Sequence, residues 1–213
     1  EETAHYDEGL EWYRQQMPYS YEDQITLEKS PQYFRDEFSP HRIYEFNPKT
    51  KLILIVREPV TRLISQYSNQ KKLRAEIEPF EDLVIDSNGK VNNESSYIRH
   101  GVYWTSLEHY LEVFPRDQIL VVNGDELIQN PLVVIEEVET FLKISPLITT
   151  ENLYFDEAKG FYCMRSDVIN GCLGSKKGNK HEQVKPELIS LFRKFYAPHN
   201  KHFYKLSGID FKW

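Results

Sequence analysis

The chain has 213 residues, of which 40% are hydrophobic and 14% aromatic, and this suits a single globular domain with a sizeable core. Its 26 basic and 33 acidic residues give a net charge of −7, which excludes a molecule that binds polyanions over its whole surface, so an anion site must be a local patch. No apolar run approaches the roughly 20 residues that cross a bilayer. Because the chain begins with Glu1 and shows no secretory signal, we expect a mature or truncated piece of a longer protein.

Helical and strand-like patterns alternate along the chain. The expected helical segments are 8–17, part of 33–46, 59–70, 97–114, a segment from 131 to 142, and 186–196, and the expected strands are 24–28, 52–56 and 118–122. Residues 145–183 show no clear period and are expected to form a loop. Strands that alternate with helices of ten or more residues favour an α/β domain with a mainly parallel sheet.

Two of the expected helices have a recognisable core face. In the helix at 97–114 the apolar side chains that share one face are Tyr103, Leu107, Tyr110, Leu111 and Phe114. In the helix that begins at Pro131 they are Leu132, Ile135, Val138, Phe141 and Leu142.

The junction between residues 52–56 and the next helix carries the strongest sign of chemistry. Five apolar residues predict a short, fully buried strand, which ends at Arg57, and Pro59 sits where a first helical turn begins. An arginine at such a junction, with free helix amides and a hydroxyl such as that of Ser65, is a good anion receptor. The alternative is that Arg57 only caps its strand and pairs with Glu58 or another carboxylate, and these residues alone do not decide between the two.

A lysine also lies at a strand-to-turn junction. Lys29 follows the strand-like run 24–28 and precedes Ser30 and Pro31. Ligands of parallel α/β sheets bind beyond the carboxyl ends of the strands, where Lys29 and Arg57 are expected to lie.

Two further basic segments stand out in this acidic chain. Residues 174–181 read GSKKGNKH, in which Lys176, Lys177 and Lys180 could hold an anion while the glycines allow close backbone approach. Residues 71–74 carry three cations that could steer an anionic substrate. For both segments a solvated, charged surface is the favoured interpretation.

The cysteines and one sequon suggest the cellular compartment only weakly. Cys163 and Cys172 are nine positions apart, and a disulfide that closed this loop would be worth ~2.7 kcal/mol. Two free buried thiols remain the alternative. Asn93 begins an Asn-Glu-Ser sequon in a polar stretch that is expected to be an exposed loop, so it is a candidate glycosylation site.

Several motifs are missing from the sequence. No GxxxxGK[ST] phosphate loop occurs, no CxxC or HExxH pattern indicates zinc, and no GxSxG indicates a serine hydrolase. Nucleic-acid binding favours a basic domain, and this one is acidic. We therefore expect neither a metal site nor a nucleic-acid partner.

Eight segments, in order, resemble one family. They are GLEWYRQQMP (9–18), ITLEKSPQYF (25–34), LILIVREPVTRLISQY (52–67), HYLEVFP (109–115), VVNGDELIQNP (121–131), LYFDEAKGFYC (153–163), CLGSKKGNKH (172–181) and FYKLSGIDFKW (203–213). Together they are similar to the heparan sulfate glucosamine 3-O-sulfotransferases, and the likeness covers nearly the whole chain.

The resemblance implies an activity, a fold and a location. These enzymes transfer a sulfonate group from 3′-phosphoadenosine 5′-phosphosulfate to the 3-hydroxyl of glucosamine units in heparan sulfate. The implied fold is a P-loop-like α/β sulfotransferase fold in which helices flank a mainly parallel sheet, here as one domain over residues 1–213. The implied location is the Golgi lumen, with a type II membrane anchor in a segment that this sequence does not include.

The resemblance also implies roles for individual residues. Arg57 and Ser65 match positions that hold the 3′-phosphate of the donor. Lys29 matches a lysine close to the transferring sulfonate, where its charge would offset the developing negative charge; the alternative is a pair with Glu28. Lys177 and Gly178 match a segment that folds over the 3′-phosphate.

The resemblance further implies that Cys163 and Cys172 form a disulfide. Departures from the family pattern limit these expectations. Asn179 stands where the family has an arginine, unless Lys180 substitutes for it, and Asn69 replaces an acceptor-contacting glutamine.

The family's donor loop and the glutamate base of its E-x-H-F-F segment are expected upstream of Glu1, so we expect these 213 residues alone to be weakly active or inactive. The rival functions are a non-catalytic heparan-sulfate-binding relative that kept the fold, and a sulfotransferase for another glycan acceptor.

Overall fold

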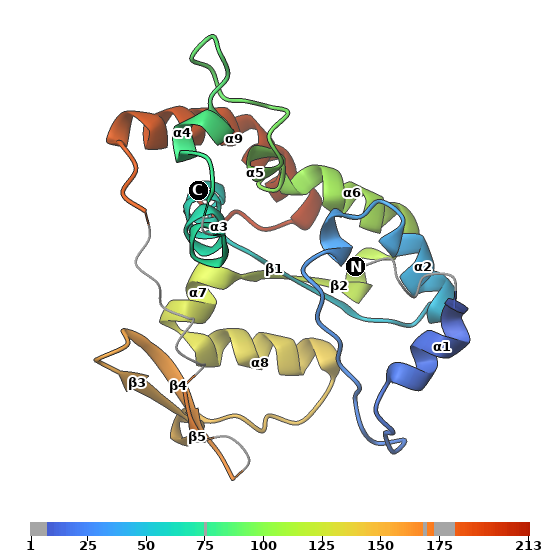
Figure 1. Ribbon diagram of the computed structural model, residues 1–213. Helices are drawn as coiled ribbons and strands as arrows, with labels where there is room; N and C mark the ends of the chain where they lie inside the picture. The colour runs from blue at the N-terminus through green and yellow to red at the C-terminus, as the bar shows by residue number, and fades with distance from the viewer. Residues whose placement is uncertain (1–7, 75, 168–169, 173–181) are drawn as a thin grey trace.

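A computed structural model describes residues 8–74, 76–167, 170–172 and 182–213 (Figure 1). Its helices are α1 (Gly9–Gln16), α2 (Ser39–Phe46), α3 (Pro59–Leu73), α4 (Phe80–Val84), α5 (Ser96–Arg99), α6 (Tyr103–Val113), α7 (Gly124–Gln129), α8 (Pro131–Leu142) and α9 (Pro186–Ser207). Its strands are β1 (Leu52–Val56), β2 (Ile119–Asn123), β3 (Leu153–Asp156), β4 (Phe161–Arg165) and β5 (Asn170–Gly171). Short 3₁₀ turns at Tyr33–Arg35, Arg116–Gln118 and Thr150–Asn152 join some of them.

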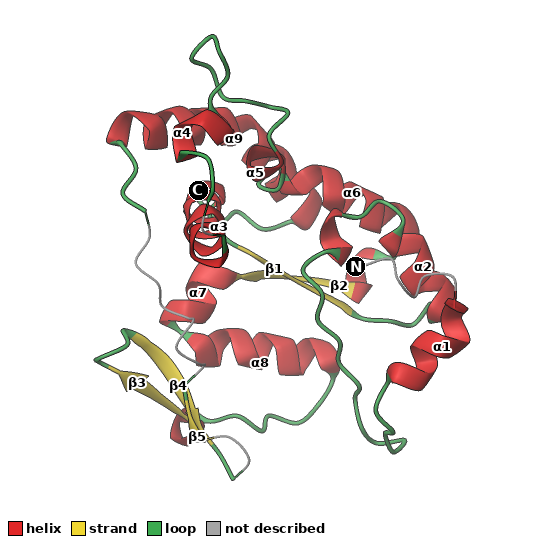
Figure 2. Cartoon of the chain, in the orientation of Figure 1, coloured by secondary structure: helices red, strands yellow, loops and turns green. Residues whose placement is uncertain are grey.

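The centre of the molecule is a parallel pair of strands. β1 and β2 pair in register from Leu52 opposite Ile119 to Val56 opposite Asn123. Figure 2 shows this pair between α6 on one side and α8 on the other. The expectation of an α/β fold with a parallel sheet is confirmed, and the register brings the carboxyl ends of both strands to the same edge, where Arg57 and Gly124 follow.

Strand β1 is less buried than its composition predicts. Val56 is buried, but Ile55 is 55% exposed, so the expectation of a fully buried strand was wrong. In the part of the chain that the structure describes, only β2 pairs with β1, and no described side chain closes over Ile55. By contrast β2 buries Ile119, Val121 and Val122, as its apolar run predicts.

Two expectations for the chain outside the central pair were also wrong. Residues 24–28 form no strand; Ile25 and Leu27 are exposed, and among the described residues no strand pairs with this run. The expected loop at 145–183 contains an antiparallel sheet in the order β3-β4-β5. Aromatic residues in β3 and β4 favour strands, and Gly160, with φ of 71°, allows the turn between them.

Helix boundaries differ from the expectations where a proline or a glycine intervenes. The last helix continues through Pro198 to Ser207 instead of ending near 196, because Asn200 and Phe203 beyond the proline are buried. The segment at 97–114 is divided into α5 and α6, with Gly101 between them. The helix from Pro131 presents Val134 to the core, while Leu132, Ile135, Val138, Phe141 and Leu142 are only half-buried.

Two hydrophobic clusters form the core, and α9 contributes to both. The first cluster joins the strands to α6 and contains Val56, Tyr103, Leu107, Tyr110, Phe114, Ile119, Val121 and Phe203. The second joins α3 to α4, α5 and α9 and contains Val60, Leu63, Tyr67, Phe80, Val84, Ile98, Phe192 and Tyr196. The expected core face of α6 is therefore confirmed, apart from the half-buried Leu111. Burial of these aromatic side chains fixes α6 against the strands and α3 against α9, and thereby holds the two ends of the junction after β1.

Within the described ranges, the structure has no helix whose length and apolar content would let it span a bilayer.

Candidate functional site

The guanidinium of Arg57 is fixed from the neighbouring strand. Its Nε donates to Oδ1 of Asp125 at 2.8 Å, and the other carboxylate oxygen of Asp125 accepts the backbone N–H of Glu58 at 3.2 Å. Both side chains of the pair are 29% exposed. The bond uses only Nε, and no described residue accepts a hydrogen bond from the two terminal nitrogens of Arg57. These nitrogens are the pair that forks onto phosphate or sulfate oxygens.

Arg57 pairs with a carboxylate, as one alternative expected, but not with that of Glu58. Glu58 does not pair with it, because the Glu58 carboxylate caps α3, accepting from the backbone N–H of Thr61 at 2.6 Å and from its hydroxyl at 2.7 Å. The carboxylate that does pair with Arg57 is that of Asp125. Pairing and anion binding are compatible here, since the pair occupies one edge of the guanidinium.

Two more residues hold the junction in shape. Gly124 packs against Arg57: an added Cβ would lie 2.8 Å from Arg57 Cγ and 3.0 Å from the Val56 carbonyl oxygen. The hydroxyl of Tyr103 donates to the carbonyl oxygen of Arg57 at 2.9 Å. Burial raises the pKa of Tyr103 to about 12, so the hydroxyl remains a donor at neutral pH.

Ser65 and Asn69 lie on one face of α3. They are four residues apart, which stacks them one helical turn from each other. Ser65 is half-buried and Asn69 exposed. Among the described residues the Ser65 hydroxyl has no hydrogen-bond partner, whereas the next serine, Ser68, is buried and donates to the Ile64 carbonyl oxygen. A half-buried hydroxyl without a protein partner is available to a ligand.

Lys29 lies in the exposed segment that leads to the turn at Tyr33–Arg35. The alternative pairing with Glu28 is not present, because Glu28 accepts the hydroxyl of Tyr33 at 2.5 Å. No carboxylate in the described ranges forms an ion pair with Lys29. Its ammonium group can therefore reach a substrate without first breaking a salt bridge.

The lysine segment at 174–181 lies outside the described residues, and with it Lys177, Gly178 and Lys180. The described residues that flank it are both anchored. Cys172 forms the expected disulfide with Cys163 of β4, with 4.4 Å between the Cα atoms. Glu182 donates its backbone N–H to Ser68 Oγ at 2.9 Å, and its carboxylate pairs with Lys71 at 2.9 Å. The chain therefore returns to α3 directly beside the helix turn that carries Ser65.

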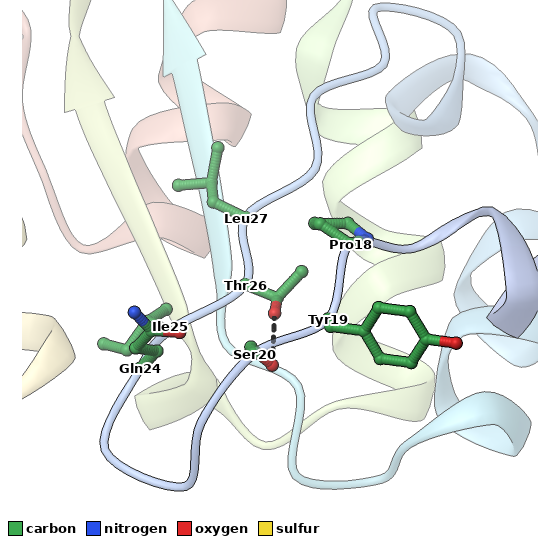
Figure 3. A pocket seen from close by; sticks show the side chains of 7 residues that line it. All are labelled: Pro18, Tyr19, Ser20, Gln24, Ile25, Thr26 and Leu27. Atoms are coloured by element: carbon green, nitrogen blue, oxygen red, sulfur yellow. Dashed lines mark hydrogen bonds between the residues drawn. The ribbon is translucent and has the colours of Figure 1, made fainter.

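Three other groups of residues lie outside the junction. Asp156 lies beside Cys163 and Cys172, but the two sulfurs are bonded to each other and provide no thiolate ligands for a metal. The sequon residue Asn93 is exposed in a turn, as expected. The segment 18–27 curves around a shallow hollow of about 370 Å³, in which Ser20 and Thr26 share a hydrogen bond (Figure 3). None of the residues that line it is charged, so it lacks the means to hold an anion.

Asp125 and Tyr103 are the site residues that the sequence alone did not identify. One signal was available for Asp125: it follows an apolar strand by two residues, as Arg57 follows another by one, and parallel strands end at the same edge of a sheet. No local pattern points to Tyr103, because its spacing in α6 is that of a core residue. Its hydroxyl contacts Arg57, which lies 46 positions away in the sequence.

Comparison with known proteins identifies the family of the chain. The family model of the sulfotransferase domain matches residues 1–207. The chain is 44% identical to the human protein named heparan sulfate glucosamine 3-O-sulfotransferase 5, over 98% of the chain and 62% of that protein. It is 40% identical to human heparan sulfate glucosamine 3-O-sulfotransferase 3B1, over 98% of the chain and 55% of that protein. The chain thus spans little more than half of the length of these relatives.

A solved structure shows the same fold at lower identity. The crystal structure of a sulfotransferase from Alicyclobacillus acidocaldarius superposes with a TM-score of 0.61 over 86% of this chain and 64% of that chain, at 20% sequence identity. The fold agrees with the match of the domain model over nearly the whole sequence. The chain belongs to the sulfotransferase domain family.

Proposed function

We propose that this chain transfers a sulfonate group from 3′-phosphoadenosine 5′-phosphosulfate to the 3-hydroxyl of glucosamine units in heparan sulfate. The observation that carries the proposal is the state of Arg57: Asp125 orients it through Nε while its terminal nitrogens have no described acceptor. The sulfotransferase family implies the donor, and the activity named for the two human relatives supports the acceptor.

The site residues divide into two groups by the part of the donor that each would contact. Arg57 and Ser65 would bind the 3′-phosphate, the first as a fork of two donors and the second through its hydroxyl. Lys177, Gly178 and Lys180 would close over the same phosphate. Both flanks of their segment are anchored, one by the Cys163–Cys172 disulfide and the other at α3.

Lys29 would act at the reacting atoms. In an in-line displacement the bond between sulfur and the bridging oxygen breaks while the 3-oxygen of the sugar bonds to sulfur, and negative charge grows on the leaving phosphate oxygen. An ammonium group without an internal salt bridge stabilises this charge. The proton of the sugar hydroxyl passes to a general base, which we expect to be a glutamate outside these 213 residues. Asn69, which shares a helix face with Ser65, would contact the acceptor.

The remaining expectations concern the compartment. We propose a Golgi-lumenal enzyme with a carbohydrate chain at Asn93. The disulfide supports an oxidising compartment, and the exposure of Asn93 makes the sequon accessible.

Donor binding can be measured by titration calorimetry with adenosine 3′,5′-bisphosphate. Removing a charge-assisted hydrogen bond in Arg57→Ala should weaken binding by about 1.5–3 kcal/mol, or roughly 10- to 150-fold. Arg14→Ala is the control, since Arg14 pairs with Glu11 at the surface of α1. An affinity of Arg57→Ala equal to that of the parent would show that Arg57 only caps its strand.

The transfer itself requires a product analysis, made with the protein that contains this chain. Radiolabelled donor and heparan sulfate should yield label at the glucosamine 3-oxygen, and Lys29→Ala should lower kcat more than it raises KM. Label at another position, or only on another glycan, would make the protein a sulfotransferase for a different acceptor. Binding of heparan sulfate without any transfer would make it a non-catalytic relative.

A further inference from the structure

A second concave site is lined by residues of the turn that precedes α2, of α5, of the segment that joins α5 to α6, and of the start of α6. It has a volume of about 270 Å³, and its polar lining consists of Arg35, Ser96, Arg99, His100, Thr105 and Ser106, together with the hydroxyl-bearing Tyr103. None of the described residues that line it is acidic. We name this site the arginine pocket.

Arg35 and Arg62, at and behind the arginine pocket, donate hydrogen bonds to neutral acceptors. Arg35 Nη1 donates to the His100 ring at 2.9 Å, and its Nη2 donates to the side-chain oxygen of Gln32. Behind His100, Arg62 donates to the side-chain oxygen of Gln66 at 2.5 Å and to the carbonyl oxygen of Tyr97 at 2.6 Å. These hydrogen bonds orient the arginines through neutral acceptors.

The acidic groups near the pocket compensate little of this charge. The Glu94 carboxylate is 4.0 Å from Arg99 Nη1 and 90% exposed, so the pair is weak. In addition, the Nε atom of Arg62 is buried and has no hydrogen-bond partner among the described residues. In a protein with a net charge of −7, a concave site that is lined by two arginines and no acidic residue, with a third arginine close to His100, needs a functional reason.

The imidazole of His100 adds no charge of its own. Its pKa is lowered to about 4, first by burial and then by Arg35, Arg62 and Arg99. At neutral pH it is therefore an uncharged acceptor that positions Arg35. An anion in the pocket would weaken the repulsion from the arginines and allow the ring to bind a proton more readily.

We propose that the arginine pocket binds a sulfate group of the glycan acceptor, on a sugar unit other than the one that receives the sulfonate. The inference rests on the proposed function. The hydroxyls of Ser96 and Ser106 supply neutral donors beside the arginines, and a combination of guanidinium groups and hydroxyls can bind the oxygens of a sulfate group; the Thr105 hydroxyl donates to the Val102 carbonyl oxygen instead.

The position of the pocket agrees with a polymeric ligand. Tyr103 lines it and also donates to the carbonyl oxygen of Arg57, so the pocket is one side chain away from the donor junction. Arg35 follows Lys29 by six residues, so their Cα atoms are at most about 22 Å apart. A chain of several sugars can reach both Lys29 and the pocket, and the pocket would then select acceptors that already carry a sulfate at the right distance.

Arg99→Gln tests the pocket, because Arg99 is largely exposed and its loss leaves the core intact. The probes are a sulfated heparin octasaccharide, an unsulfated N-acetylheparosan octasaccharide, inorganic sulfate and adenosine 3′,5′-bisphosphate, each titrated by calorimetry. Arg99→Gln should bind the sulfated octasaccharide about five- to tenfold more weakly, and Arg99→Lys should recover part of the loss. Arg14→Gln is the matched control, since the Arg14 side chain is 61% exposed and that of Arg99 63%.

Nuclear magnetic resonance of the His100 ring supplies a readout that a purely structural role would not change. The sulfated octasaccharide should shift its signals in a saturable way and raise its pKa, and the unsulfated octasaccharide should do neither. The proposal is overturned if Arg99→Gln binds the sulfated octasaccharide as the parent does, if the His100 signals do not respond, or if inorganic sulfate alone binds as tightly as the octasaccharide. Affinity for adenosine 3′,5′-bisphosphate should be unaffected by Arg99→Gln, so failure of the pocket and failure of the donor site are separate results.

Discussion

Gly124 and Arg57 pack so closely that the backbone of one shapes the side chain of the other. A Cβ at position 124 would come within 2.8 Å of Arg57 Cγ and 3.2 Å of Ile55 Cγ2. The glycine follows β2 and the arginine follows β1, and the parallel register places them at the same edge of the sheet. The donor junction thus depends on the absence of a side chain at this position.

Gly124→Ala should therefore displace Arg57 and weaken binding of adenosine 3′,5′-bisphosphate by about tenfold, or about 1.4 kcal/mol. The measurement is titration calorimetry on the folded variant, with circular dichroism to verify the fold. An unchanged affinity would mean that Arg57 keeps its position after the backbone adjusts.

Gly101→Ala is a matched substitution away from Arg57. Its Cβ would lie 2.8 Å from the hydroxyl oxygen of Tyr196, which is buried and donates to the Ile98 carbonyl oxygen. We expect a loss of about 1–3 kcal/mol in the free energy of unfolding from overpacking, with donor affinity retained. Urea unfolding and calorimetry together distinguish this variant from Gly124→Ala; equal effects of the two on donor affinity would contradict the assignment.

Asp125 should matter through orientation more than through charge. In Asp125→Asn the amide oxygen can still accept from Arg57 Nε, although the amide NH₂ group cannot accept the Glu58 N–H, so we expect affinity for adenosine 3′,5′-bisphosphate to stay within about threefold of the parent. In Asp125→Ala both the bond to Arg57 and the bond to the Glu58 N–H are lost, and affinity should fall by about tenfold. If the alanine variant binds as tightly as the asparagine variant, Asp125 does not position Arg57.

The sequence predicted those parts of the site that follow from local pattern. Arg57 was found because an apolar strand ends at it and a proline starts the next helix, and Ser65 because it lies on that helix. Asp125 is 68 positions away and depends on strand pairing, which a local pattern does not contain. The same limit explains the fold. The continuation of α9 beyond Pro198 depends on partners distant in the chain, because Phe203 packs against the strands and α6. The hairpin of β3 and β4 is local, and its aromatic residues and Gly160 were a signal that the sequence analysis did not use.

The Cys163–Cys172 disulfide should stabilise the fold because it lowers the conformational entropy of the unfolded chain. The bond closes a loop of nine positions, for which the chain-entropy estimate is ~2.7 kcal/mol. Replacing both cysteines with serine should lower the free energy of unfolding by about that amount, measured by urea titration. Thiol titration of the denatured parent should find no free thiol from these two residues without reductant. One thiol per cysteine would contradict the bridge.

His100 should make the stability depend on pH. Its pKa in the folded protein is about 4, below the ordinary value of 6.5. Burial lowers it most, and the charges of Arg35 in the turn before α2, Arg62 on α3 and Arg99 on α5 lower it further. As the pH falls, the unfolded chain therefore binds the proton first. The free energy of unfolding contributed by neutral His100 is fully present above about pH 6.5, decreases between about 6.5 and 4, and changes no further below that.

Replacement of His100 by glutamine removes this titration while keeping a side chain that can accept a hydrogen bond from Arg35. We expect urea midpoints of the parent to fall more steeply than those of His100→Gln between about pH 7 and pH 4.5. Other titrating groups contribute equally to both proteins, so the difference between the two slopes reports His100 alone. Parallel slopes for the parent and His100→Gln would mean that the pKa of His100 is the same in the folded and the unfolded chain. A steeper slope of His100→Gln would mean that the folded protein raises this pKa, and a ring that is protonated at neutral pH could not accept a hydrogen bond from Arg35.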